Sequence, residues 1–90
     1  MANLEGYRNQ LDGIDSEMKE LFIKRMKTVE FIAREKWDNN IPIFQPEREK
    51  EVIAKNSADV DEYLRPLYEK FLRSMMDISK EHQLDTIRDL

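Results

Sequence analysis

The stretch that decides the fold runs from Leu4 to Asp38 and reads LEGYRNQLDGIDSEMKELFIKRMKTVEFIAREKWD. Its apolar residues recur at steps of three, four or seven, the spacing of one face of an α-helix. These positions are Leu4, Leu11, Met18, Phe22, Val29 and Ile32, with Tyr7, Ile14 and Leu21 widening the stripe. Asn3 stands where a capping residue would begin the helix, and the Asn-Asn-Ile at 39–41, before a proline, ends it. The pattern therefore predicts one continuous helix of about 35 residues.

Prolines divide the rest of the chain. Pro46 predicts the first position of a short helix that runs to about Lys55, and NSAD at 56–59 predicts a turn. A third helix follows, with Pro66 either in its first turn or kinking a longer helix that starts near Asp61. Its apolar residues are Leu67, Tyr68, Phe71, Leu72, Met75, Met76 and Ile78. We expect one all-α domain over residues 1–90, with one long, one short and one medium helix.

The length of the first helix predicts a partner. At 1.5 Å per residue it would extend roughly 50 Å, whereas a compact 90-residue domain has a radius of gyration of about 12 Å. Its apolar stripe would project beyond a single chain. We therefore expect an intertwined antiparallel homodimer, in which two long helices pack along each other and the shorter helices fold back over them.

Composition excludes several function classes. A net charge of -4 argues against nonspecific binding to nucleic acid or to an anionic membrane. The chain has no cysteine, and the lone His82 cannot by itself form a metal cluster or a Ser/His/Asp triad. No apolar run approaches the roughly 18 residues of a membrane span, and the N-terminus lacks the apolar core of a signal peptide. We expect a cytoplasmic protein that uses no metal and no cofactor.

Three cations interrupt the apolar stripe of the long helix: Arg8, Arg25 and Lys36. A cation on an apolar face is costly unless it meets an anion. Arg25 and Lys36 lie about 20° apart around the helix and roughly 16 Å apart along it, so their long side chains could converge on one ligand. Arg8 lies roughly 25 Å before Arg25, too far to join that ligand within one straight helix. In an antiparallel dimer, the partner's Arg8 could reach it.

Other polar groups complete the predicted pocket. Ser79 and Gln83 follow the buried face of the third helix at i, i+4, and Arg48 with Glu49 stands in the first turn of the short helix. Together these side chains supply cations, one carboxylate, one amide and one hydroxyl. Such a set suits a small polyanion that carries a hydroxyl group.

In these positions the chain resembles the all-helical chorismate mutases. The matching segments are LEGYRNQLDGID (4–15), KRM (24–26), AREK (33–36), PEREKEVI (46–53) and FLRSMMDISKEHQ (71–83), which span nearly the whole chain. Two features depart from the family: Gln45 stands where an acidic residue is common, and residues 56–66 align only with a change of length.

The resemblance implies that the chain rearranges chorismate to prephenate, a pericyclic reaction that needs no covalent enzyme intermediate. It implies that the protein holds the substrate in a compact conformer and stabilises charge on the ether oxygen. By the same resemblance, Arg25 and the partner's Arg8 hold the two substrate carboxylates, and Ser79 assists one of them.

The resemblance also gives roles to the remaining positions. Lys36 and Gln83 would donate hydrogen bonds to the ether oxygen. Glu49 would accept one from the ring hydroxyl of the substrate, while Arg48 orients Glu49 or adds positive potential.

Two other functions are compatible with the sequence. A related enzyme class of the same fold eliminates pyruvate from isochorismate in a similar cationic pocket. The chain could instead be a non-catalytic helical dimer that serves another enzyme of the shikimate pathway as an interaction or regulatory module. Taken singly, Arg48 and Glu49 also fit a solvated helix face with local ion pairs. The seven positions taken jointly favour the mutase.

Overall fold

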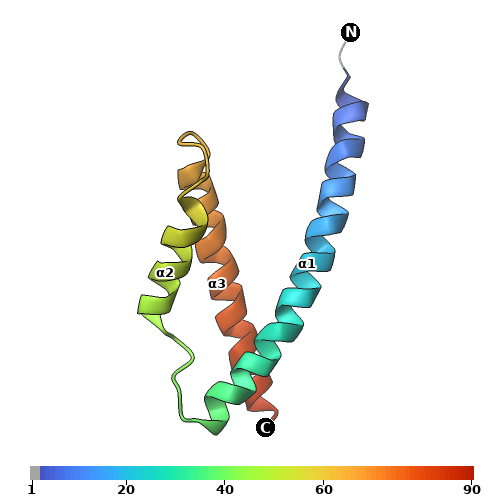
Figure 1. Cartoon of the computed structure of the whole chain (residues 1–90). Helices are drawn as coiled ribbons and strands as arrows, with labels where there is room; N and C mark the ends of the chain where they lie inside the picture. Colours follow the sequence, from blue (N-terminus) through green and yellow to red (C-terminus); the bar gives the residue numbers. More distant parts are fainter. Residues whose placement is uncertain (1–2) are drawn as a thin grey trace.

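The computed structural model describes residues 3–90, which form three helices and no strand. These are α1 (Leu4–Asp38), α2 (Pro46–Ser57) and α3 (Arg65–Arg88), drawn in Figure 1. The predicted all-α class and the order of long, short and medium helices are confirmed. Pro66 lies in the first turn of α3, so the longer kinked helix does not occur.

The short helix ends later than expected, at Ser57 rather than near Lys55. The Ser57 hydroxyl donates to the Ile53 carbonyl at 2.6 Å, and the Asn56 amide donates to the Val52 carbonyl at 2.8 Å. These side chains bond back to the preceding turn, which is compatible with a helical backbone. The polar NSAD segment therefore starts as the last turn of α2 instead of leaving it.

The ends of α1 differ in how they are capped. Asn3 occupies the position before the helix, but its side chain makes no capping hydrogen bond. At the other end, Asn40 has a φ of 56°, and the Ile41 amide donates to the Lys36 carbonyl at 2.8 Å. A left-handed residue followed by this 6→1 bond is the Schellman arrangement, which asparagine tolerates well. It reverses the chain direction and brings the connector before α2 back over the end of α1.

The third helix joins the other two. α3 packs against both α1 and α2, whereas the backbones of α1 and α2 lie farther apart. Figure 1 shows that α1 and α3 approach at the Asp38 end of α1 and diverge towards its N-terminal half. The small apolar core lies where they meet, and its buried residues are Val29, Ala33, Leu72 and Met76.

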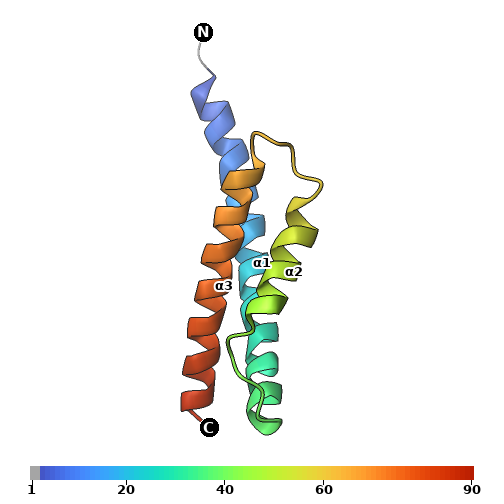
Figure 2. The same ribbon diagram turned by 90° about the vertical axis from the view of Figure 1, so that its left-hand side faces the viewer.

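The single chain is elongated (Figure 2), measuring 59 × 28 × 15 Å with a radius of gyration of 16.6 Å. That is well above the roughly 12 Å expected of a compact chain of this length. The apolar stripe of the N-terminal half of α1 is largely uncovered: Leu11 is 55% exposed and Phe22 is 49% exposed. An apolar groove of about 720 Å³ lies between this half and α3. No helix within residues 3–90 has the apolar length needed to span a membrane.

Candidate active site

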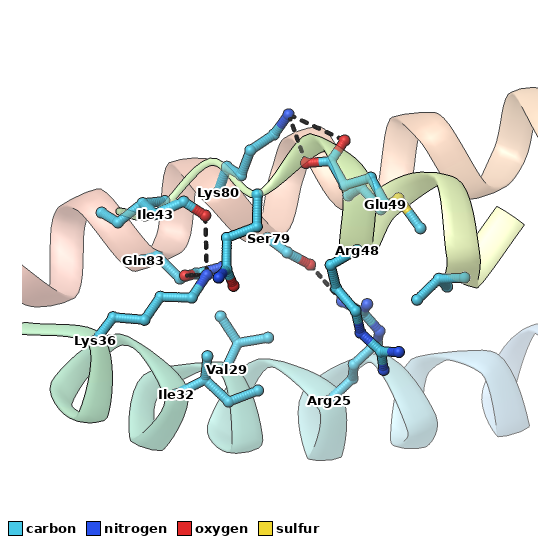
Figure 3. Close-up of a pocket in the computed structure, with 13 residues that line it drawn as sticks. Arg25, Val29, Ile32, Lys36, Ile43, Arg48, Glu49, Ser79, Lys80 and Gln83 are labelled. Atoms are coloured by element: carbon cyan, nitrogen blue, oxygen red, sulfur yellow. Dashed lines mark hydrogen bonds and ion pairs between the residues drawn. The ribbon is translucent and has the colours of Figure 1, made fainter. Parts of the chain in front are cut away.

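A cavity of about 230 Å³ lies between α1 and α2, with α3 behind both (Figure 3). α1 and α2 pack against α3 and not closely against each other, so space remains between them. The polar residues of its wall are Arg25, Lys36, Gln45, Arg48, Glu49, Ser79, Lys80 and Gln83. The apolar ones are Val29, Ile32, Ile43, Val52 and Met76. The volume is below the roughly 300 Å³ of the smallest typical pockets for drug-sized ligands, so the cavity suits a small metabolite.

Six of the seven predicted site residues line this one cavity, and Arg8 does not. The Arg8 side chain is 60% exposed and pairs with Glu5 at 3.1 Å, near the start of α1. The other six come from three helices that meet only through α3: Arg25, Lys36, Arg48, Glu49, Ser79 and Gln83. Within one chain, the geometry therefore leaves Arg8 outside the site.

Arg25 and Ser79 form one side of the cavity. An Arg25 guanidinium N–H donates to the Ser79 hydroxyl, which in turn donates to the Met75 carbonyl at 2.9 Å. Ser79 is buried, so this bond fixes the direction of the guanidinium. Burial lowers the pKa of Arg25, but a guanidinium remains protonated at neutral pH. Its other N–H groups remain available to a carboxylate in the cavity.

Lys36 and Gln83 form the opposite side. The Lys36 ammonium donates to the Ile43 carbonyl and to the Gln83 amide oxygen, both at 2.8 Å. Gln83 is only 6% exposed, and its oxygen is committed to Lys36, so its NH₂ group is the free end. The ammonium also keeps one N–H beyond these two bonds. Two donors from different helices thus lie side by side, as Figure 3 shows.

The pKa of Lys36 reflects the position of its amine in the cavity wall. Burial lowers its pKa from the ordinary 10.5, and the negative charge of Glu49 acts in the opposite direction. The Schellman turn after α1 returns the chain so that the Ile43 carbonyl accepts a hydrogen bond from the amine.

Glu49 pairs with a residue that sequence reasoning missed. The Lys80 ammonium lies 3.1 Å from one carboxylate oxygen of Glu49 and 3.4 Å from the other. Arg48 instead pairs with Glu51 at 3.5 Å, and its side chain is 68% exposed. One signal could have revealed Lys80: it follows the buried Met76 by four positions, as Ser79 follows Met75.

The cavity is cationic although the chain is acidic. Four cations, Arg25, Lys36, Arg48 and Lys80, line it against the single carboxylate of Glu49. In the described part of the chain, no three His, Cys, Asp or Glu side chains gather as a metal site would require. The arrangement can hold a small dianion, donate hydrogen bonds to an oxygen that gains negative charge, and accept one from a hydroxyl.

Comparison with known proteins agrees with this geometry. The family model for chorismate mutase type II matches residues 7–84. A T-protein from Enterobacter agglomerans is 31% identical over 78 residues, which are 84% of this chain and 21% of the relative. A T-protein from Haemophilus influenzae is 37% identical over 49 residues, which are 54% of this chain and 13% of the relative.

The chain thus spans about a fifth or less of the curated relatives it matches. No solved structure matches it significantly. The family match covers most of the chain and contains every position of the cationic cavity. On this basis the chain belongs to the chorismate mutase type II family.

Proposed function

We propose that the protein is a chorismate mutase, which rearranges chorismate to prephenate in phenylalanine and tyrosine biosynthesis. One observation carries the proposal: Lys36 and Gln83 present neighbouring free donors inside a cavity that Arg25 flanks on one side and Glu49 on the other. A mutase needs this combination, because its substrate is a hydroxylated dicarboxylate whose ether oxygen gains negative charge as the C–O bond breaks.

The reaction places two demands on the protein. The substrate must be held in the compact conformer in which the new C–C bond can form while the C–O bond breaks. Donors must also already point at the place where negative charge develops. No nucleophile and no proton transfer to an enzyme group are required, so the cavity works by shape and charge.

The protein restrains the conformer by binding the two substrate carboxylates. Arg25 binds one of them, with Ser79 holding the guanidinium and assisting the same group. The partner's Arg8 binds the second. The ether oxygen then lies against the free N–H of Lys36 and the NH₂ group of Gln83.

Recognition of the hydroxyl falls to α2. Glu49 lines the cavity and accepts a hydrogen bond from the substrate hydroxyl. Arg48 lines it too, and because it pairs with Glu51 its contribution is positive potential rather than contact with Glu49.

The role of Arg8 makes a homodimer part of the proposal. The uncovered stripe of α1 and the apolar groove beside it supply the surface for two antiparallel copies. The test is to mix Arg8→Ala chains with Arg25→Ala chains. Each variant alone should be nearly inactive, and random exchange should restore about a quarter of the wild-type sites, since each mixed dimer has one intact site. The shared site would be refuted if activity did not rise on mixing, provided that a separate measurement shows that the two variants exchange subunits.

The activity itself is tested with purified protein by following the loss of chorismate absorbance and identifying the product by chromatography. A parallel incubation contains isochorismate. Prephenate from chorismate is the expected result. Salicylate and pyruvate from isochorismate alone would make the protein a lyase, and no turnover of either substrate would favour a non-catalytic module.

A cytoplasmic location stays a prediction.

A further inference from the structure

We propose that Lys80 is a positioning residue of this site, which holds the Glu49 carboxylate at the cavity wall and away from Lys36. The inference rests on the proposed function, because it concerns the acceptor for the substrate hydroxyl. It begins with the ion pair that joins α3 to α2 across 31 positions of sequence.

The Lys80–Glu49 pair differs from most ion pairs in the described residues. Pairs such as Lys50–Glu47 join neighbours within one helix, and their side chains are 75% and 86% exposed. The Lys80 and Glu49 side chains are 25% and 26% exposed. Partly buried charges are screened less by solvent, so this pair constrains its members more than a surface pair does.

A second contact ties Lys80 to the entry of α2. Its ammonium lies 4.5 Å from the centre of the Phe44 ring, a cation–π distance. Phe44 immediately precedes Gln45 and Pro46, where α2 begins. Since the α2 backbone packs against α3 and not against α1, the placement of α2 opposite Arg25 and Lys36 depends mainly on α3. Lys80 is therefore one of the groups that place the α2 wall of the cavity.

The pair also keeps two opposite charges apart. Glu49 acts electrostatically on Lys36, opposing the effect of burial on the Lys36 pKa. Without Lys80, the carboxylate would be free to turn towards the Lys36 amine, which lines the same cavity. That turn would occupy the N–H that the ether oxygen requires and withdraw the acceptor from the hydroxyl. Loss of Lys80 should therefore weaken both the hydrogen bond to the ether oxygen and the recognition of the substrate hydroxyl.

The first test is Lys80→Met. We expect kcat/KM to fall roughly tenfold or more, because small displacements of a positioned group cost this much or more. Lys80→Arg should restore most of the loss, since a guanidinium can pair with the same carboxylate. Lys80→Gln is measured as well, so that a folding failure of the methionine variant does not remove the test.

Two matched control variants test whether the loss of activity comes from the position of Glu49 or only from a change in charge or stability. Asp77→Asn removes the other ion-pair partner of Lys80, which is 73% exposed and does not line the cavity. Lys50→Met makes the same change of charge on the exposed side of α2. Both controls should retain wild-type kcat/KM.

A double-mutant cycle shows whether Lys80 acts through Glu49. In a Glu49→Gln background, Lys80→Met should cost much less than it does in the wild type, because the group it positions is already gone. Additive losses in the double variant would overturn the proposal, as would wild-type kcat/KM in both Lys80→Met and Lys80→Gln.

A readout without substrate completes the test. Burial lowers the pKa of Lys80, but hydrogen bonds with Glu49 and Asp77 outweigh it and hold the pKa above 10.5. Lysine side-chain NMR should show this pKa falling in Glu49→Gln, and an unchanged value would refute the ion pair. Wild-type turnover is measured first. Its absence would refute the proposed function and would leave the titration to decide whether Lys80 holds Glu49; with turnover present, the Lys80 proposal is refuted by the variants or by the titration.

Discussion

Lys36→Ala removes the amine that joins α1, the connector and α3. In the folded chain this amine donates to the Ile43 carbonyl and the Gln83 amide oxygen, both at 2.8 Å, and its remaining N–H faces the cavity. Alanine leaves the ether oxygen without its charged donor. Loss of one such donor typically costs about 3 kcal/mol of transition-state stabilisation, a hundredfold or more in rate. We expect kcat to fall by at least this factor.

The cost to folding should be smaller. Two hydrogen bonds from a charged donor are lost, each with a net value of about 1.5 to 3 kcal/mol. The variant also avoids the cost of removing the Lys36 ammonium from water, and this same burial lowers the Lys36 pKa. The two effects oppose each other, so we expect the free energy of unfolding to fall by about 2 kcal/mol, which corresponds to a decrease in Tm of roughly 8 to 16 °C.

The assay follows chorismate absorbance at saturating substrate, with circular dichroism melting curves for each protein. Lys24→Ala is the control, because Lys24 is an exposed lysine of the same helix and does not line the cavity. The control should keep wild-type turnover. Full turnover by Lys36→Ala would refute the assignment of the ether oxygen to this amine, and a collapse of its Tm would show that the residue is structural.

Four further predictions concern pH, the core and the dimer. Because burial lowers the Lys36 pKa below 10.5, kcat/KM should fall as pH rises through that lower value, which a pH-rate profile measures. The same shift means that the unfolded state binds more protons, so the contribution of Lys36 to the free energy of unfolding should rise with pH up to about 10.5. Leu72→Ala should lower the free energy of unfolding by about 2 to 5 kcal/mol in urea titrations, because Leu72 is 2% exposed. Leu11→Asp should reduce the mass seen by sedimentation and make activity depend on protein concentration, since it places a charge in the apolar stripe.

Local pattern accounts for much of the molecule. The period of the apolar residues predicts α1 from Leu4 to Asp38, because helical periodicity is a property of neighbours three and four positions apart. The same arithmetic brings Arg25 and Lys36 to one face of α1, and Ser79 and Gln83 to one face of α3. Within a rigid helix, spacing along the chain is equivalent to position in space, so these pairs needed no tertiary structure.

What joins different helices could not be read in this way. The pair of Glu49 with Lys80 spans 31 positions and depends on how α2 packs against α3, for which no periodicity applies. The Ile43 carbonyl reaches Lys36 only because the chain reverses at Asn40, a backbone event outside any helix. Sequence alone thus determined which side chains share a helix face. The tertiary structure decided which faces meet, because contacts between helices depend on turn geometry and packing rather than on spacing along the chain.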